Sequence, residues 1–320
     1  MRTITLEEHY ATQTLLDVPT ENARYDFRAF PPLVAQLCDL GDGRLKAMDV
    51  AGIDLQVLSL TAPGVEQLDV ADAVSVARDA NDQLAAAVRR HPTRFAGFAA
   101  LPTADPNTAA DELERTVRDY SFKGALINGH TRGRYLDDPF FRPILERAEA
   151  LAVPLYLHPT PPPQAVVEAT YAGLSPRITA LLSTGAWGWH IETAQHVLRL
   201  ILSGAFDRYP RLQLVIGHLG ETLPFKLPRF DVALPSQATG LARLVSAYLR
   251  ENVHYTFSGF NWTSAFLDLL FQVGVDRIMF STDYPYASMA EARAFLDRLP
   301  VSPADRERIA HGNAERLLGL

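Results

Sequence analysis

Glu7 and His9 are the first residues along the chain whose types and spacing suit metal chemistry, and they lie at the end of an apolar stretch. Side chains alternate faces along a β-strand, so Glu7 and His9 would point the same way and Glu8 the opposite way. A carboxylate beside an imidazole at the end of a buried strand suits Zn²⁺ or a harder ion such as Mn²⁺. The same residues could instead form the polar end of a surface strand, so the choice depends on ligands from elsewhere.

His158, His218 and Asp283 end later strand-like stretches of the chain. In a parallel β/α barrel, functional residues gather at the carboxyl ends of the strands, and closure places the first and last strands side by side. Glu7, His9, His158 and Asp283 can therefore converge on one ion from distant points of the sequence. Each histidine alone is better explained as a hydrogen-bonded core residue, but four coinciding strand ends favour a metal site.

His218 and Glu221 form a second polar group, in which His218 ends a strand and Glu221 begins the following helix. A nearby carboxylate favours the charged imidazolium and fixes its tautomer, which suits a proton shuttle or a partner for Asp283. Glu221 also has a structural explanation, because an acidic residue in the first helical turn complements the helix dipole.

Other polar and aromatic residues are weaker candidates. Asn128 follows a strand and could bind a polar substrate, and Arg229 could pair with a substrate carboxylate or lie on a solvated helix face. Residues with no spacing argument behind them, which could still line the pocket, bind its ligand or pack against a subunit, are Arg24, Tyr25, His130, Arg132, Trp187 and Trp189.

The elements that must position these residues alternate along the chain. Eight strand-like stretches, near-continuous in hydrophobicity as strands buried on both faces should be, occupy residues 4–9, 54–60, 95–101, 124–127, 154–158, 212–218, 253–257 and 277–283. Helical patterns separate them, most clearly at 70–90 and 106–120. The pattern predicts an α/β fold, a single (β/α)₈ TIM barrel over residues 1–320 with insertions on its C-terminal face. An open, doubly wound sheet is the alternative.

Composition excludes several classes of partner. The chain has 320 residues, 48% of them hydrophobic, and a net charge of −7 with no cluster of Lys or Arg, which argues against nucleic acid or an anionic membrane as a partner. Its one cysteine, Cys38, excludes an intramolecular disulfide and fits a reducing compartment. No signal-peptide core or membrane-spanning run is present, so we expect a cytoplasmic protein.

Several motifs together resemble the amidohydrolase-2 branch of the amidohydrolase superfamily, and within it the metal-dependent, non-oxidative decarboxylases of ortho-hydroxybenzoates. Among the stretches that carry the resemblance are Leu6-Glu7-Glu8-His9-Tyr10, Leu155-Tyr156-Leu157-His158-Pro159, Gly217-His218-Leu219-Gly220-Glu221 and Phe280-Ser281-Thr282-Asp283-Tyr284-Pro285. Glu-x-His, in place of the His-x-His of most hydrolytic relatives, favours decarboxylation. Tyr10, where Phe is common, and the stretch 260–262 depart from the pattern and leave the substrate open.

The resemblance also implies roles and an assembly. It implies that the metal ligands are Glu7, His9, His158 and Asp283, that His218 and Glu221 are catalytic partners of Asp283, and that Arg229 and Asn128 contact the substrate. It further implies a homodimer or homotetramer.

We expect one divalent ion, Zn²⁺ or Mn²⁺ with Mg²⁺ also admitted, to hold the carboxylate and ortho hydroxyl of an aromatic acid. Asp283 would protonate the ring carbon that bears the carboxylate, with His218 and Glu221 setting its pKa, before CO₂ leaves. The alternative within the superfamily is hydrolysis of a lactone or amide, with Asp283 as the general base. A third interpretation is a non-catalytic barrel that binds a metal or another ligand.

Overall fold

The computed structural model of the chain describes residues 1–18 and 30–320, so Arg24 and Tyr25 lie outside the described residues. Its strands form two parallel sheets. The first contains β1 (Ile4–Tyr10), β2 (Leu55–Leu60) and β3 (Phe95–Gly97). The second contains, in order, β4 (Ala99–Ala100), β5 (Ala125–Asn128), β6 (Leu155–His158), β7 (Leu214–Ile216), β8 (Val253–Thr256) and β9 (Ile278–Met279).

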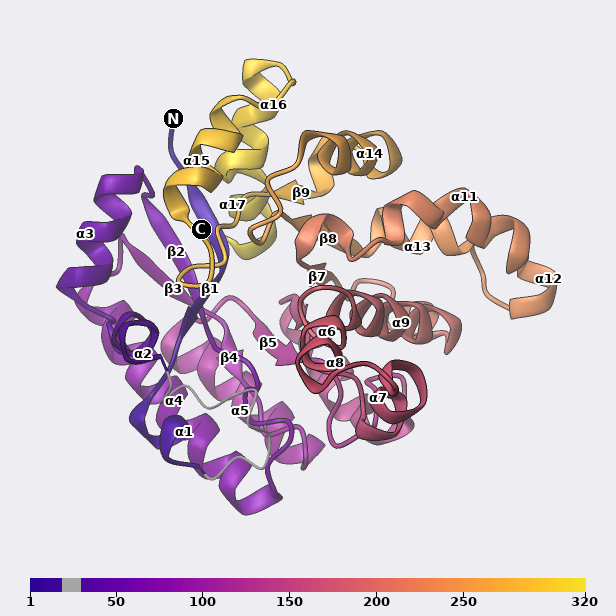
Figure 1. Cartoon of the computed structure of the whole chain (residues 1–320), viewed down its shortest axis with the longest axis horizontal. Helices are drawn as coiled ribbons and strands as arrows, with labels where there is room; N and C mark the ends of the chain where they lie inside the picture. Colours follow the sequence, from indigo (N-terminus) through magenta and orange to yellow (C-terminus); the bar gives the residue numbers. More distant parts are fainter. Residues whose placement is uncertain (19–29) are drawn as a thin grey trace.

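Two links join these sheets into a ring (Figure 1). The strands β3 and β4 are two halves of one strand position, and between them the Phe98 amide donates to the Leu58 carbonyl at 2.9 Å. At the other junction Leu6 forms a parallel bridge with Ser281, next to β9. The strands therefore follow one another around eight positions in sequence order, which confirms the predicted (β/α)₈ fold. The first and last strands are neighbours, unlike those of a doubly wound sheet.

Helices surround the ring, and two of them have the predicted bounds. These are α4 (Val70–Arg90), capped by the Asp69 side chain, and α5 (Pro106–Tyr120), capped by Asp105 with Pro at its first position. The other helices between or after the strands are α3 (Asp42–Ala51), α6 (Arg142–Leu151), α9 (Gly188–Leu202), α10 (Ala205–Arg208), α11 (Leu223–Ala233), α12 (Ser236–Thr239), α13 (Val245–Glu251), α14 (Thr263–Val273), α15 (Met289–Asp297), α16 (Pro303–Glu307) and α17 (Asn313–Leu318).

The predicted insertions contain short helices. These are α1 (Gln13–Asp17) and α2 (Pro31–Cys38) after β1, and α7 (Gln164–Tyr171) and α8 (Pro176–Leu182) after β6. Within the described ranges, no helix is both long and apolar enough to cross a bilayer.

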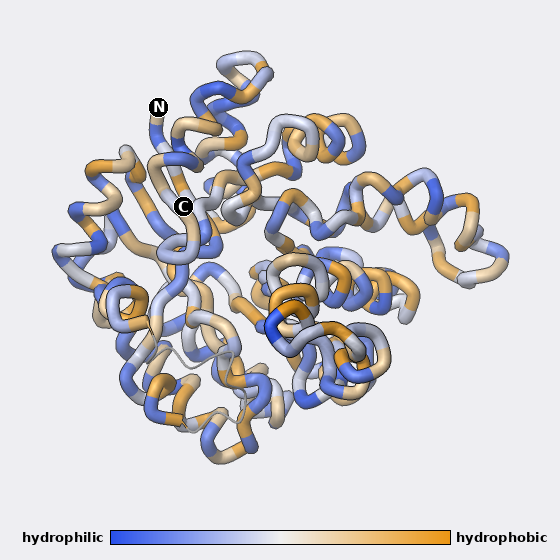
Figure 2. The backbone as a smooth tube through the Cα atoms, viewed as in Figure 1, coloured by the Kyte–Doolittle hydropathy of each residue, from blue (hydrophilic) through white to orange (hydrophobic). Residues whose placement is uncertain are grey.

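The core has two layers. Inside the ring, Ile4, Leu6, Phe98 and Tyr156 belong to one buried cluster, and α17 adds apolar side chains to it. A larger cluster fills the space between strands and helices. Figure 2 shows polar and apolar residues interspersed along the outer helices, as expected where one helix face packs on the strands. The polar residues at the strand ends therefore lie above an apolar plug.

Candidate active site

A β-bulge at the end of β1 sets the direction of the first candidate residues. The pairing register between β1 and β2 shifts between Leu6 and Glu8, and Glu7 has a positive φ of 64°. Leu6 faces the inner core, and the bulge turns the next residue, Glu7, inward as well. Beyond the bulge, alternation sends Glu8 outward and His9 inward, so Glu7 and His9 share a side as the sequence predicts.

Glu7, His9 and His158 form a compact buried group of metal-binding side chains. One ligand atom from each lies within 4.8 Å of the others. His158 Nε2 is 3.4 Å from Glu7 Oε1, and His9 Nε2 is 3.2 Å from Asp283 Oδ1. The Asp283 side chain is 18% exposed, whereas those of Glu7 and His9 are fully buried. The structure therefore brings together all four predicted ligands, and the group reaches solvent at Asp283.

The donor atoms of this group fit a divalent cation. Among the described residues, Glu7 Oε1, both ring nitrogens of His9 and Nδ1 of His158 are buried and make no hydrogen bond of good geometry, which is rare for buried polar atoms. Burial, joined by the nearby His158 imidazole, keeps the pKa of His9 below its ordinary value despite Asp283. A neutral imidazole is the form that binds metal. Carboxylate oxygens and neutral imidazoles suit Zn²⁺ and Mn²⁺.

The second oxygen of Glu7 is held by residues that sequence reasoning missed. Tyr156 and Ser258 both donate hydroxyl hydrogen bonds to Glu7 Oε2. Burial opposes the charge of Glu7, but the charge of His218 and the nearby imidazoles of His158 and His9 outweigh it and hold the pKa of Glu7 below its ordinary value. Tyr156 precedes His158 by two residues on β6, so period-two alternation could have placed it on the same face.

A second buried cluster adjoins the first. His218 Nδ1 is 2.7 Å from Glu221 Oε1, and the other Glu221 oxygen is 2.6 Å from Nδ1 of His190. His218 Nε2 lies 3.7 Å from Glu7 Oε1, which connects the two clusters. His190 Nε2 is 3.0 Å from the Gly185 carbonyl. The sequence points to His190 only as a residue at the end of the long insertion and assigns it no role, because no strand ends at it.

The charges in this cluster favour an imidazolium at His218. Burial opposes that charge, but Glu221 and Glu7 outweigh it and raise the pKa of His218 to about 10. Burial likewise opposes the charge of Glu221, and His218 and the hydrogen bonds from both histidines hold its pKa below the ordinary value. His218 and Glu221 are therefore an ion pair at neutral pH.

The structure corrects the prediction that Glu221 begins a helix. Strand β7 ends at Ile216, His218 opens a 3₁₀ turn, and α11 begins only at Leu223. Glu221 has a φ of 54° and stands outside the helix, so the helix-dipole explanation for it is wrong. Its burial between two histidines accounts for its type instead.

Backbone strain concentrates at the candidate site. Glu7, His218, Glu221 and Asp283 all have φ between 52° and 64°, in the left-handed region that disfavours non-glycine residues. Each such residue costs about 1–3 kcal/mol and persists only where its surroundings enforce it. The strained backbone therefore belongs to four of the residues that the sequence predicts to be metal ligands or catalytic residues.

Asn128 lies beside the metal-binding group. It ends β5 in register with His158 of β6, so the two side chains share a face of the barrel. The backbone N–H of Asn128 donates to Glu66 Oε1 at 2.7 Å. Burial raises the pKa of Glu66 to about 7. His130 turns away, with Nε2 3.1 Å from the Pro161 carbonyl. A contact from Asn128 to the substrate stays a prediction.

Arg229 is not brought to the site within one chain. It is exposed on α11 and makes no hydrogen bond or ion pair with the residues that the structure describes. Trp187 is exposed as well, at 48%. The predicted contact between Arg229 and the substrate stays a prediction.

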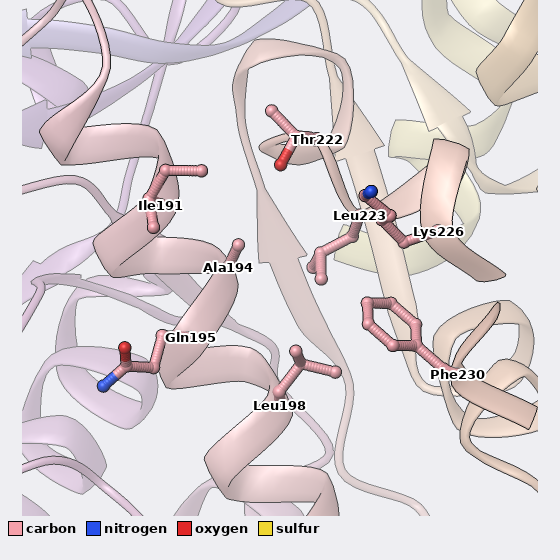
Figure 3. A pocket seen from close by; sticks show the side chains of 8 residues that line it. All are labelled: Ile191, Ala194, Gln195, Leu198, Thr222, Leu223, Lys226 and Phe230. Atoms are coloured by element: carbon pink, nitrogen blue, oxygen red, sulfur yellow. The ribbon is translucent and has the colours of Figure 1, made fainter. Parts of the chain in front are cut away.

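A separate surface hollow of about 280 Å³ lies between α9 and α11 (Figure 3). Figure 3 shows Leu198, Leu223 and Phe230 pointing toward one another across it, with Thr222 and Lys226 at its edge. None of the predicted site residues lines this hollow, so it is distinct from the polar clusters.

The family model described as Amidohydrolase matches residues 27–320. The chain therefore belongs to this family, as the motifs indicate.

Within the family, the chain is similar to decarboxylases of hydroxylated aromatic acids. It is 40% identical to a γ-resorcylate decarboxylase of Polaromonas sp., over 99% of this chain and 98% of that protein. A crystal structure of dihydroxybenzoic acid decarboxylase from Polaromonas sp., with bound manganese and the inhibitor 2-nitroresorcinol, has a TM-score of 0.91 at 39% identity and covers 100% of this chain and 97% of that one. The 5-carboxyvanillate decarboxylase of Sphingomonas paucimobilis has a TM-score of 0.92 at 35% identity, with 100% and 99% covered.

Proposed function

We propose that this protein is a metal-dependent, non-oxidative decarboxylase of an ortho-hydroxybenzoate-type aromatic acid. The observation that carries the proposal is the group of unpaired buried donor atoms on Glu7, His9 and His158 beside the partly exposed carboxyl of Asp283. The relatives named above are all decarboxylases of such acids, and none is a hydrolase. This favours decarboxylation over hydrolysis of a lactone or amide.

Glu7, His9, His158 and Asp283 would hold one divalent ion, Mn²⁺ or Zn²⁺, with Mg²⁺ also admitted by the carboxylates. A related structure contains manganese. When bound, the ion supplies positive charge that holds the substrate's carboxylate and ortho hydroxyl and stabilises negative charge on the ring oxygen.

Asp283 is the proton donor in this proposal. It transfers a proton to the ring carbon that bears the carboxylate, and that carbon then carries both the new hydrogen and the carboxylate. The bond to the carboxylate breaks, CO₂ leaves, and the electron pair of that bond restores the aromatic ring. Asp283 is left as a carboxylate, and its 18% exposure lets it regain a proton from water. The His218 imidazolium, held by Glu221, stabilises the carboxylate that Asp283 becomes.

The proposal includes an assembly and a compartment. Phe225 and Val232 on α11 and Phe271 on α14 are large apolar side chains with 71%, 74% and 82% exposure, which supports a homodimer or homotetramer that covers them. Cys38 is a free, exposed thiol, which supports a reducing, cytoplasmic compartment.

The test combines a substrate panel with one variant. Mn²⁺-loaded protein is incubated in D₂O with 2,6-dihydroxybenzoate, other hydroxybenzoates and a lactone, and CO₂ and deuterium in the product are measured. We expect CO₂ from a hydroxybenzoate and one deuterium at the vacated carbon. Asp283→Asn should lower kcat by roughly 10²–10⁴-fold, because it removes the acid. Asp297→Asn, on the surface of α15, is the control and should keep full activity.

Two results would contradict the proposal. Hydrolysis of the lactone without CO₂ from any hydroxybenzoate would favour the hydrolase alternative. Full decarboxylation by Asp283→Asn would remove Asp283 as the proton donor.

A further inference from the structure

Glu8 lies on the outer side of β1, outside the metal-binding group, and is fully buried. Its carboxylate accepts hydrogen bonds from the residues on both sides of Asp283. The Thr282 amide donates to Oε1 at 2.8 Å, and the Thr282 hydroxyl donates to Oε2 at 2.6 Å. The Tyr284 amide donates to Oε2 at 3.4 Å. Both sequence neighbours of Asp283 are thus attached to a single carboxylate on the strand that carries Glu7.

The same carboxylate is held from behind. Gln56 Nε2 donates to Glu8 Oε2 at 3.2 Å, and the side-chain oxygen of Gln56, Oε1, accepts from Arg44 at 3.3 Å. Arg44 is fully buried and also donates to the His9 carbonyl at 2.6 Å. One polar network therefore holds both the strand of Glu7 and His9 and the loop of Asp283.

The loop of Asp283 needs such a restraint. Asp283 has a φ of 63°, a conformation that its own residue type disfavours. Its carbonyl accepts from the amides of Tyr286 and Ala287, which forms a turn but does not attach that turn to β1. One backbone bond attaches the loop to β1, because the His9 amide donates to the Tyr284 carbonyl at 2.7 Å. Glu8 adds the side-chain attachment on both sides of Asp283, and it therefore restrains where the Asp283 carboxyl lies relative to His9 Nε2.

We propose that Glu8 is a positioning residue, which holds Asp283 at the distance from Glu7 and His9 that metal binding and proton transfer require. This inference rests on the proposed function. In the part of the chain that the structure describes, the Glu8 side chain makes its hydrogen bonds to Gln56, Thr282 and Tyr284 and none to a side chain of the metal-binding group, so it acts through the position of Asp283.

Glu8→Gln tests this proposal directly, because glutamine has nearly the size of glutamate but a different set of hydrogen-bond donors and acceptors. Three of the four partners of Glu8 are N–H groups that can only donate, namely the backbone amides of Thr282 and Tyr284 and the side-chain NH₂ of Gln56. The fourth is the Thr282 hydroxyl. The NH₂ of a glutamine must face one of these groups whichever way the side chain is flipped. Glu8→Gln therefore places a donor against a donor and loosens the loop of Asp283.

The experiment is a double-mutant cycle read by Mn²⁺ affinity, measured by calorimetric titration of the full-length protein. We expect Glu8→Gln to weaken Mn²⁺ binding roughly 10–100-fold, the range seen for residues that orient metal ligands. In an Asp283→Asn background, which removes the ligand carboxylate, Glu8→Gln should change the affinity less than about 3-fold, because the residue it positions is already lost. An equal effect in both backgrounds, or no effect in either, would overturn the proposal.

Two further variants and an activity assay keep the outcomes separable. Thr282→Val removes one of the hydrogen bonds with little change in shape, and Thr282→Ser retains it. The Mn²⁺ affinity should fall in Thr282→Val and stay near the wild-type value in Thr282→Ser. If Glu8→Gln does not fold, this pair of variants takes its place in the test. Wild-type decarboxylation of the whole panel of hydroxybenzoates is measured alongside. Its absence would contradict the proposed function and leave the Mn²⁺ cycle as an independent test of Glu8.

Discussion

Helix α9 contributes to two buried clusters that contain the same residue types but differ in charge. At its start, His190 contacts Glu221, which holds His218. One turn and a half further on, His196 accepts the Leu136 amide at Nε2, 2.8 Å away. Its helix neighbour Glu192 pairs at 2.5 Å with the hydroxyl of Tyr135 instead of with a histidine.

Burial alone does not decide the charge of a histidine in these clusters. It disfavours the imidazolium in both, and His196, which also lies near other positive groups, has a pKa lowered to about 3. His218 has its pKa raised to about 10, because Glu221 and Glu7 lie against it. A carboxylate in direct contact therefore separates a cationic histidine at the candidate site from a neutral one in the scaffold.

The largest expected effect comes from removing the carboxylate that makes this difference. Glu221→Gln keeps the shape of the side chain but removes the charge that holds the His218 imidazolium. We expect kcat for decarboxylation to fall by roughly 10²–10⁴-fold, the range for a group that acts in proton transfer. Steady-state kinetics on the Mn²⁺-loaded protein measure this effect.

Glu192→Gln is the matched control, because its amide oxygen can still accept from Tyr135. It should change kcat by less than about 3-fold, since the proposed chemistry does not use Glu192 and the hydrogen bond is retained. If both variants lost the same factor in kcat, both carboxylates would serve only the fold. The contrast between the two clusters would then fail.

His190 should give a smaller effect, because it acts through Glu221. His190→Leu removes the donor at 2.6 Å from Glu221 Oε2 and should lower kcat roughly 10–100-fold. It should also shift the pH–rate profile, since Glu221 would then hold His218 less firmly. His190→Asn returns a donor near the position of Nδ1 and should recover part of the activity. Equal losses in both variants with an unchanged pH profile would indicate a packing role only.

The barrel and the convergence of its strand ends could be predicted from the sequence because both depend on local patterns. Apolar stretches alternate with helical ones, and the helices at 70–90 and 106–120 begin and end at capping and proline signals in the chain itself. Given the barrel, parallel strands bring Glu7, His9, His158 and Asp283 to one end regardless of loop structure.

The remaining features depend on contacts between distant segments. The bulge that turns Glu7 inward is fixed by pairing with β2 and by the bridge from Leu6 to Ser281, which no local pattern reports. The left-handed turn that carries Glu221 places it against His190, and no hydrophobic periodicity marks such a turn. The alternation along the strand predicts that Glu8 points outward, but its hydrogen bonds to Thr282 depend on closure of the ring.

The smallest expected effect concerns stability in the scaffold cluster. The pKa of His196 lies near 3 in the folded chain and near 6.5 in an unfolded one, so the unfolded state takes up the proton first as pH falls. The stability that neutral His196 contributes is fully present above pH 6.5 and is lost as the pH falls toward 3. Between pH 7 and pH 5 this amounts to roughly 2 kcal/mol in the free energy of unfolding.

His196→Gln isolates that contribution, because glutamine can still accept the Leu136 amide and does not titrate. Urea denaturation at pH 7 and pH 5 should show a loss larger by roughly 2 kcal/mol in the wild type than in the variant. At pH 7 the variant should decarboxylate at the wild-type rate, since His196 contacts none of the candidate site residues. An equal loss of stability in both proteins would mean that folding does not lower the pKa of His196, and the contrast with His218 would fail.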